Sequence, residues 1–446
     1  MNWLLDRFLL APKDKISFIH KDVKYTYTDI YNNIYQIKEA LNNLNIEKGS
    51  TIILIADYSP NVFCMLFALA SLNCIIVPMT PNTVIDQDEA LLICGCDYII
   101  NFNNDGITWS SSKHTVITDN ILLKDFYTAN TPGLILFSSG STGKPKGMLH
   151  DFNSIINKFK LIRNPIISIP FLMLDHFGGI NTILAITSSL GTIVTTENRS
   201  LRIICEAISA HKVELLPTTP SFLTLLSSSD IPSKYDLTSL KRITYGTETM
   251  PQSTLKRIQD YFPNVEFQQT YGLSEVGVLS SKSKPDGSLW VKIGGKGFET
   301  QVRDGILWIR SNYRMVGYLN APSGFDNNNW FNTQDRVEVD GEYFKILGRV
   351  TDLINVGGQK VYPAEVEDVI LSQPNIADVV VMGEKNALLG QIVIAKILLV
   401  SPELPNELRL RIRRACFTKL TAFKVPVKVE IINNEIYSNR FKKIRS

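Results

Sequence analysis

Cysteine and histidine are scarce in this sequence, and their spacing excludes the sites they usually build. Six cysteines and five histidines occur among 446 residues. No two cysteines form a C-x-x-C pair and no histidine stands at zinc-finger spacing, so neither a disulfide framework nor a zinc site is expected. We therefore predict reduced thiols in the core of a cytoplasmic protein. The cysteines, most of them inside apolar runs, are Cys64, Cys74, Cys94, Cys96, Cys205 and Cys416.

Net charge and long apolar runs are missing too. Lysine and arginine number 46 against 43 acidic residues, and the resulting charge of +3 predicts no bulk attraction to nucleic acid or to an anionic membrane. No uninterrupted apolar run reaches the roughly 20 residues needed to span a bilayer. The apolar first ten residues include Asp6 and Arg7 and lack the basic segment and cleavage site of a signal peptide.

Apolar residues in alternating strand and helix patterns are abundant. The chain is 44% hydrophobic and long enough for two or three domains. Strand–helix–strand units of this size favour an α/β fold with parallel sheets covered by helices. The predicted elements are a helix within 24–47, strands at 51–55 and 74–78 around a helix at 61–72, and strands at 213–216 and 242–245 around a helix near 220–228.

The pattern changes near residue 286. Short apolar segments then alternate with Gly and Asp/Asn turns, which predicts antiparallel hairpins. Beyond the junction at 347–351, helices at 363–372 and 405–420 and strands at 377–382, 391–400 and 427–432 predict a small α+β domain. We therefore divide the chain into residues 1–348, a junction at 349–352, and residues 353–446.

A glycine-rich stretch from Ser138 to Gly147 follows an apolar run that reads as a buried strand. Its ten residues include three glycines, four hydroxyl side chains and two lysines. Backbone N–H groups in such a turn can bind anions, and lysine adds positive charge. A surface turn with solvated lysines is the alternative. Pro145 directly after Lys144 excludes the Walker loop, where a helix begins at the lysine. The predicted phosphate-binding residues are Ser138, Ser139, Gly140, Ser141, Thr142, Gly143, Lys144 and Lys146.

The stretch closely resembles the [YF]-[TS]-S-G-[ST]-T-G-x-P-K-G signature of the adenylate-forming superfamily. This superfamily of AMP-dependent synthetases and ligases includes acyl-CoA synthetases, adenylation domains of nonribosomal peptide synthetases, and luciferases. The resemblance covers about residues 24–446. It implies a large, multi-layer N-terminal domain with mixed sheets flanked by helices, and a small, mobile C-terminal α+β domain that rotates about a hinge at 349–352.

Two further motifs resemble the substrate and nucleotide sites of the superfamily. His176, within the run 174–179, would lie beside the substrate carboxylate, although a structural histidine is the alternative reading. The run 269–275 resembles Y-G-x-T-E, where Tyr271 would pack on adenine, Ser274 would donate to a phosphate and Glu275 would help to hold Mg²⁺. Alone, the same run could be a strand-to-turn segment with a solvated glutamate. Gly246, Thr270 and Gly272 complete the nucleotide residues expected in this region.

The run 330–335, together with 348–352, resembles the pair W-[FY]-x-T-G-D and G-R-x-[DK]-[DE]. Asp335 would accept hydrogen bonds from the ribose hydroxyls, and Arg349 would lie near the ribose and the hinge. The sequence departs from this pair twice. Gln334 replaces the usual glycine before Asp335, and Thr351 stands where a charged hinge residue is usual. The run 245–250 departs in a similar way from the more usual Gly-Gly-Ala/Glu-Pro-Leu.

Two C-terminal motifs concern the second half of the expected reaction cycle. The run 354–367 resembles the loop that superfamily members present for thioester formation, with Gly357, Gly358 and Lys360 as the expected thiol-acceptor residues. At the C-terminus, Ile444 sets the register that makes Lys443 the candidate catalytic lysine, with Lys442 in place of the usual glycine. A basic tail is the alternative reading of this last segment.

The resemblance implies an ATP-dependent acid–thiol ligase with Mg²⁺, whose acceptor is CoA or the phosphopantetheine of a carrier protein. A stand-alone adenylation enzyme that loads a carrier protein, and a non-catalytic nucleotide-binding protein, are the alternatives. Amino-acid-activating members carry an aspartate directly after the residue that His176 matches, and here that position is Phe177. We therefore expect an acid without an α-ammonium group, although Asp175 is only one residue away. The motifs leave the acid, the acceptor and the oligomeric state open.

Overall fold

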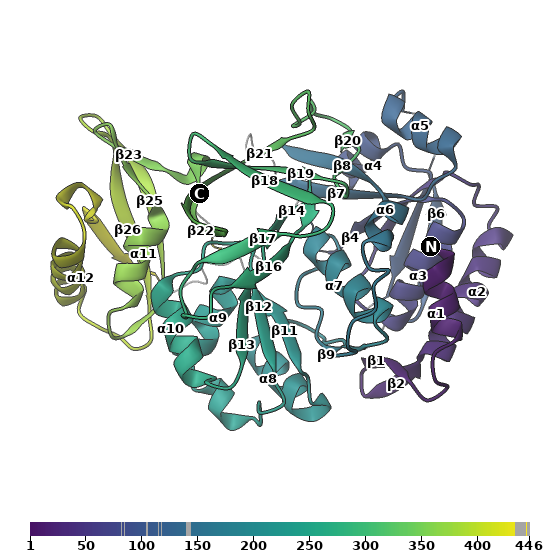
Figure 1. The fold of residues 1–446 in the computed structure, drawn as a ribbon, viewed down its shortest axis with the longest axis horizontal. Helices are drawn as coiled ribbons and strands as arrows, with labels where there is room; N and C mark the ends of the chain where they lie inside the picture. Colours follow the sequence, from purple (N-terminus) through teal and green to yellow (C-terminus); the bar gives the residue numbers. More distant parts are fainter. Residues whose placement is uncertain are drawn as a thin grey trace.

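Two seven-stranded sheets form the framework of the N-terminal domain in this computed structural model (Figure 1). The structure describes the chain except for residues 82, 84, 104, 105, 115, 117, 140–143, 433–442 and 444–446. The first sheet is parallel apart from its edge strand β2. Its order is β13 (Glu266–Gln269), β12 (Arg242–Tyr245), β11 (Leu215–Thr218), β9 (Ile167–Ser168), β10 (Thr192–Val194), β1 (Ile16–His20) and β2 (Val23–Thr26).

The second seven-stranded sheet has a parallel centre and antiparallel edges. Its order is β20 (Gly317–Tyr318), β8 (Pro145–Asp151), β7 (Gly133–Ser139), β4 (Ile75–Met79), β3 (Thr51–Ile55), β5 (Tyr98–Phe102) and β6 (Trp109–Lys113).

Helices fill the space between these sheets and cover their outer faces. The largest apolar cluster joins both sheets to the inner helices. One smaller cluster joins the first sheet to its outer helices, and another does so for the second sheet. The inner helices are α1 (Asn2–Leu9), α2 (Tyr27–Asn43), α3 (Pro60–Ser71), α6 (Phe152–Asn157) and α7 (Phe177–Ser188). The outer helices are α8 (Leu201–His211), α9 (Pro220–Ser228) and α10 (Gln252–Tyr261) on the first sheet, and α4 (Gln87–Cys94) and α5 (Ile121–Ala129) on the second.

Helix α3 shows why the sequence builds an inner layer. Every residue from Val62 to Ala70 is buried, so the helix is apolar on all sides and needs neighbours on all sides. Pro60 at its first position has the helical φ, and the Ser59 hydroxyl accepts a hydrogen bond from the Val62 N–H. Its position between the two sheets provides apolar neighbours on all sides.

The hairpin region predicted after residue 286 forms a six-stranded antiparallel sheet with its own apolar cluster. Its order is β16 (Ser280–Ser283), β17 (Val291–Gly294), β22 (Tyr343–Arg349), β21 (Phe331–Asp340), β19 (Ile306–Ser311) and β18 (Phe298–Arg303). A small hairpin, β14 (Gly272–Leu273) with β15 (Gly277–Val278), precedes it.

The C-terminal domain has a five-stranded sheet and two helices around a separate core, at the left of Figure 1. Its elements are β23 (Ile354–Val356), β24 (Gln359–Val361), α11 (Pro363–Leu371), β25 (Ile376–Asn386), β26 (Gly390–Leu399), α12 (Pro405–Lys419) and β27 (Lys428–Ile431). Short 3₁₀ turns are η1 (Ile231–Lys234), η2 (Val350–Asp352) and η3 (Ala422–Lys424). The predicted fold class is confirmed, whereas the hinge at 349–352, which coincides with η2, stays a prediction.

The two domains contact each other through α9, α10 and the loop before α10. The Asp368 carboxylate of α11 accepts a hydrogen bond from the Ser253 N–H, 2.7 Å away, in the first turn of α10. The Glu248 carboxylate accepts one from the backbone N–H of Lys443 at 2.7 Å. The N-cap residue of α10 is Pro251, whose side chain cannot accept a hydrogen bond. Asp368 of the C-terminal domain therefore provides the acceptor for an N–H group at this helix start.

Single elements agree with the sequence predictions in different degrees. Strands β3 and β12 have the predicted bounds, whereas β11 begins two residues later than expected, at Leu215. All six cysteines are buried as free thiols. Within the residues that the structure describes, no helix is both long enough and apolar enough to cross a membrane.

Candidate nucleotide and acyl site

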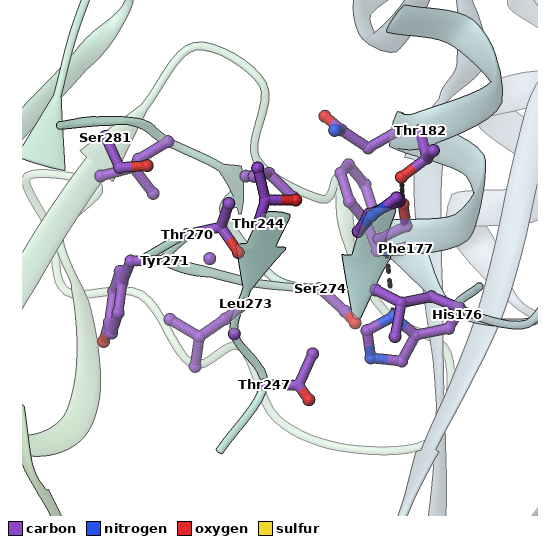
Figure 2. Close-up of a pocket in the computed structure, with 18 of the residues that line it drawn as sticks. His176, Phe177, Thr182, Thr244, Thr247, Thr270, Tyr271, Leu273, Ser274 and Ser281 are labelled. Atoms are coloured by element: carbon purple, nitrogen blue, oxygen red, sulfur yellow. Dashed lines mark hydrogen bonds between the residues drawn. The ribbon is translucent and has the colours of Figure 1, made fainter. Parts of the chain in front are cut away.

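A cavity of about 550 Å³ lies beside the carboxyl ends of the first sheet's strands, between α7 and the β14–β15 hairpin (Figure 2). Ligands of parallel α/β sheets usually bind at this edge. The cavity brings together residues from separate motifs of the sequence. The predicted site residues that line it are Ser138, Lys146, His176, Gly246, Thr270, Tyr271, Gly272, Ser274, Glu275 and Arg349.

The glycine-rich stretch joins two antiparallel strands. Strand β7 ends at Ser139 and β8 begins at Pro145, with Ser138 opposite Lys146. A strand therefore follows Lys144, where a Walker loop has a helix. Ser138 and Lys146 line the cavity, and Lys144 is exposed. The predicted residues Gly140, Ser141, Thr142 and Gly143 lie outside the described residues.

Asn320 holds the second half of this stretch in place. Its Oδ1 accepts a hydrogen bond from the Gly147 N–H at 3.0 Å, and its Nδ2 donates to the Pro145 carbonyl at 2.8 Å. Strand β20 pairs with β8 just before it. The sequence prediction missed this residue because the partners are 173 positions apart, and an asparagine after Tyr318 is no motif by itself.

Tyr318 connects the glycine-rich stretch to Glu275. The turn of the β14–β15 hairpin carries Ser274 and Glu275 into the cavity. The Tyr318 hydroxyl donates to Glu275 Oε1 at 2.8 Å, and Lys146 Nζ lies 5.2 Å from the centre of the Tyr318 ring. Burial, reinforced by the Glu275 carboxylate, raises the pKa of Tyr318, which therefore remains a hydrogen-bond donor at neutral pH.

Asp335 is engaged by two side chains of the nucleotide motifs. It pairs across the β21–β22 ladder with Arg349, whose Nε lies 3.5 Å from its Oδ1, and the Tyr271 hydroxyl donates to its Oδ2. Burial raises the pKa of Asp335, and Arg349 opposes this shift. The carboxylate predicted to bind ribose is thus held by the residue predicted to pack on adenine, which lines the cavity.

His176 occupies the N-terminal cap of α7 and lines the cavity. Its Nδ1 accepts a hydrogen bond from the Gly178 N–H at 3.0 Å. Gly179 permits the close approach of this helix start to its neighbours, since a Cβ there would collide with the Met173 carbonyl oxygen. His176 and Ser274 both line this cavity (Figure 2).

Asp175 also lines the cavity and is buried. Its Oδ2 accepts hydrogen bonds from the hydroxyls of Thr83, at 2.7 Å, and Thr80, at 3.4 Å. The two threonines thus orient the Asp175 carboxylate. If the protein activated an amino acid, this carboxylate would be the candidate to bind the α-ammonium group. Our expectation of an acid without an α-ammonium group stays a prediction.

Two departures from the family pattern fall on unusual backbone conformations. Thr247 has φ of +72° and Gln334 has φ of +60°, the region that favours glycine. Both residues line the cavity. The superfamily usually has glycine before Asp335, and glycine suits this backbone conformation. Gln334 adopts the same conformation and adds an amide side chain to the cavity wall.

The described lining of this cavity includes none of the predicted residues of the C-terminal domain, nor Ser139, Lys144 and Asp335. Gly357, Gly358 and Lys360 belong to the β23–β24 hairpin, where both glycines have positive φ. The Lys443 ammonium is buried in the C-terminal domain, 3.4 Å from Glu367 Oε2 and 3.1 Å from Asp378 Oδ1. Their proposed roles at the cavity therefore require a different domain arrangement.

Comparisons with known proteins agree with the motifs. Residues 5–319 match the family described as AMP-binding enzyme, and residues 365–443 match the AMP-binding enzyme C-terminal domain. The chain is 24% identical over 438 residues to 4-coumarate–CoA ligase 4 of Arabidopsis thaliana, covering 83% of this chain and 76% of that protein. It is 24% identical over 482 residues to a 2-succinylbenzoate–CoA ligase of Bacillus cereus, covering 99% and 96%.

A solved structure shows the same fold over nearly the whole chain. The anthranilate CoA ligase AuaEII in complex with anthranoyl-AMP superposes with a TM-score of 0.83 at 20% identity, covering 99% of this chain and 94% of that one. The two-domain architecture and the cavity motifs thus occur together in one chain. This protein therefore belongs to the AMP-binding enzyme family and is an adenylate-forming ligase.

Proposed function

We propose that this ligase activates a carboxylic acid with ATP and transfers the acyl group to the thiol of CoA. The observation that carries the proposal is a cavity lined by Lys146, Ser274, Glu275 and Arg349, with Asp335 paired to Arg349. These groups suit a triphosphate, a metal ion and a ribose, and they lie within reach of His176. The CoA ligases among the relatives support a thiol acceptor.

In the first step, a carboxylate oxygen attacks the α-phosphorus of ATP, and the bond to pyrophosphate breaks. Both reactants are anions, so positive charge and N–H or O–H donors must bring them together. We assign this role to Lys146 and the Ser138–Lys144 segment. Asp335 positions the ribose, and the His176 ring borders the place of the acid. In the second step, the thiol sulfur attacks the acyl carbon, AMP leaves and the thiol proton passes to solvent.

Glu275 is suited to bind a magnesium ion whose other ligands are mainly phosphate oxygens and water. Mg²⁺ in such sites takes one or two protein carboxylates and keeps several waters. Glu275 lines the cavity beside the Ser274 hydroxyl, and Tyr318 orients one of its oxygens. When bound, the ion would neutralise charge on the leaving pyrophosphate.

We further propose that the C-terminal domain changes position between the two steps, with 349–352 as the hinge. The thiol-acceptor hairpin at Gly357 and Gly358 and the ammonium of Lys443 cannot serve the cavity where they now lie. The docking contacts of the present arrangement include the hydrogen bonds of Asp368 with Ser253 and of Glu248 with the Lys443 N–H. A cytoplasmic location stays a prediction of the sequence.

ATP–pyrophosphate exchange with a panel of fatty, aryl, dicarboxylic and amino acids tests the first step. We expect exchange with at least one acid, and a loss of roughly 100-fold in Glu275→Gln. Lys292→Met is a control, because this lysine pairs with Glu342 on the surface. Tight ATP binding with no exchange for any acid would contradict the ligase assignment and favour a nucleotide-binding protein.

Mass spectrometry of products formed with CoA or with a phosphopantetheine-bearing carrier protein tests the acceptor. We expect acyl-CoA to form faster than acyl-carrier protein at equal thiol concentration. Faster loading of a carrier protein would assign the chain to the stand-alone adenylation enzymes instead.

A further inference from the structure

The inner part of the cavity is a channel between α7 and the first sheet. Gly178, Asn181 and Thr182 repeat at helical spacing along one face of α7, and Thr244 and Gln268 stand on the facing strands. Figure 2 shows Thr182 on the helix side of this space and Thr244 on the strand side. Much of the channel wall is therefore polar, which does not suit a long aliphatic chain.

Lys158 lies in the wall of this channel, just after α6. Its ammonium donates to Asn181 Oδ1 at 2.8 Å and to the Val278 carbonyl oxygen. The faces of Phe159 and Phe298 lie 5.3 and 5.8 Å from its Nζ. Two of its three N–H donors are thus used by neutral oxygens, and the third remains for a ligand.

No carboxylate among the described residues forms an ion pair with Lys158, and its neighbouring charge, Arg163, is also positive. Burial, with a smaller contribution from Arg163, lowers the pKa of Lys158 to about 7. A buried ammonium without an anion is costly, and cavity groups of this kind usually meet their partner in a ligand. Arg242, another cation of the same wall, already pairs with Glu266 at 2.7 Å and does not share this need.

The position of Lys158 sets the distance to the reacting end of an acid. Its partner Asn181 lies five residues after His176 on α7, a rise of about 7.5 Å along the helix. A ring or a chain of a few carbons can bridge this distance, with one carboxylate near His176 and another group near Lys158.

We propose that Lys158 and Asn181 form an anion subsite that binds a second carboxylate, so that the protein activates dicarboxylic acids. This inference rests on the proposed function, which supplies the reacting carboxylate at His176. It goes beyond that function by naming the substrate class.

Pairs of acids that differ only in the distal group test the subsite. Glutaric, adipic and phthalic acids are compared with their monomethyl esters in ATP–pyrophosphate exchange. We expect the wild type to prefer at least one diacid over its ester by about tenfold or more in kcat/KM, as a charge-assisted hydrogen bond implies. Lys158→Met should abolish this preference, and Lys158→Arg should keep it.

Lys160→Met is the matched control, since it removes an exposed lysine two residues away that does not line this cavity. Lys158→Gln replaces Lys158→Met if thermal unfolding shows that the latter does not fold. Two results would overturn the subsite. One is equal use of diacids and esters by the wild type, and the other is a preference for diacids that stays unchanged in Lys158→Met or its replacement Lys158→Gln.

Calorimetric titration with the same diacids and esters separates this inference from the ligase assignment. If no acid supports exchange but a diacid binds the wild type about tenfold more tightly than Lys158→Met, the subsite stands and the ligase function fails. If acids support exchange but diacids and esters bind alike, the ligase function stands and the subsite fails.

Discussion

At the residue scale, two departures from the family pattern fall on strained backbone conformations. Thr247 and Gln334 both have φ in the left-handed region, where a side chain costs about 1–2 kcal/mol and a β-branched one is least suited. The superfamily commonly has glycine in place of Gln334. These two residues thus retain a local strain in the cavity wall.

Thr247→Gly should therefore stabilise the protein by about 0.5–1 kcal/mol, once the larger unfolded-state entropy of glycine is subtracted. We expect a small rise in the thermal unfolding midpoint. Thr249→Gly is the control, because Thr249 is outside the left-handed region and should lose stability. A lower midpoint in Thr247→Gly would contradict the strain argument.

His150 is a second residue whose environment has a measurable consequence. It is fully buried on β8 against the Phe177 ring, and within the described part of the chain neither ring nitrogen has a hydrogen-bond partner. Burial lowers its pKa from 6.5 to about 3. Between these values the unfolded state binds one more proton than the folded state, so stability rises with pH.

The wild type should therefore lose about 1.4 kcal/mol per pH unit from this group as pH falls below 6.5. His150→Leu should show a smaller fall of the thermal midpoint between about pH 7 and pH 4.5. His114→Leu is the control, because His114 lies on an exposed segment. Parallel pH profiles of wild type and His150→Leu would refute the assignment.

At the scale of elements, strand β20 is the unexpected part of the site. Its two residues pair with β8, and they bring Tyr318 between Lys146 and Glu275. One short strand therefore couples the glycine-rich stretch to the Ser274–Glu275 turn, although the two come from different sheets.

Tyr318→Phe should raise the Mg²⁺ concentration needed for half-maximal exchange by about tenfold, because a hydrogen bond to a charged group is worth about 1.5–3 kcal/mol. Titration of exchange activity with Mg²⁺ measures this. Tyr343→Phe, on β22, serves as the control. An unchanged Mg²⁺ requirement would show that Tyr318 does not position Glu275.

At the scale of the whole molecule, the domain interface places Lys443 in a structural environment. Its ammonium lies against Glu367 and Asp378, which are 2% and 0% exposed. Its backbone N–H donates a hydrogen bond to the Glu248 carboxylate across the interface. Removing the ammonium alone leaves buried carboxylates without their cation, which is destabilising. A catalytic role must therefore be separated from this one.

We expect Lys443→Ala to lower adenylation far more than thioester formation from a preformed acyl-adenylate. Thermal unfolding of the same variant measures the structural contribution, and Lys442→Ala is the neighbouring control. Equal losses in both half-reactions, or a larger loss of adenylation in Lys442→Ala, would refute Lys443 as the catalytic lysine.

The sequence alone determined much of the fold and named many of the residues that line the cavity. Strands β3 and β12 could be located because a buried strand is a short apolar run, whatever surrounds it. The predicted residues that meet in the cavity could be named because each motif is local and carries its chemistry in a few neighbouring side chains. Family resemblance supplied their assembly.

Only the tertiary structure decided how those residues are partnered. Tyr271 with Asp335, Tyr318 with Glu275 and Lys158 with Asn181 each join segments that lie apart along the chain. Spacing in sequence holds no information on such pairs, because the fold and not the neighbouring residues brings them together. The same reason applies to Lys443, whose motif predicts a catalytic lysine and whose buried carboxylates appear only in the folded C-terminal domain.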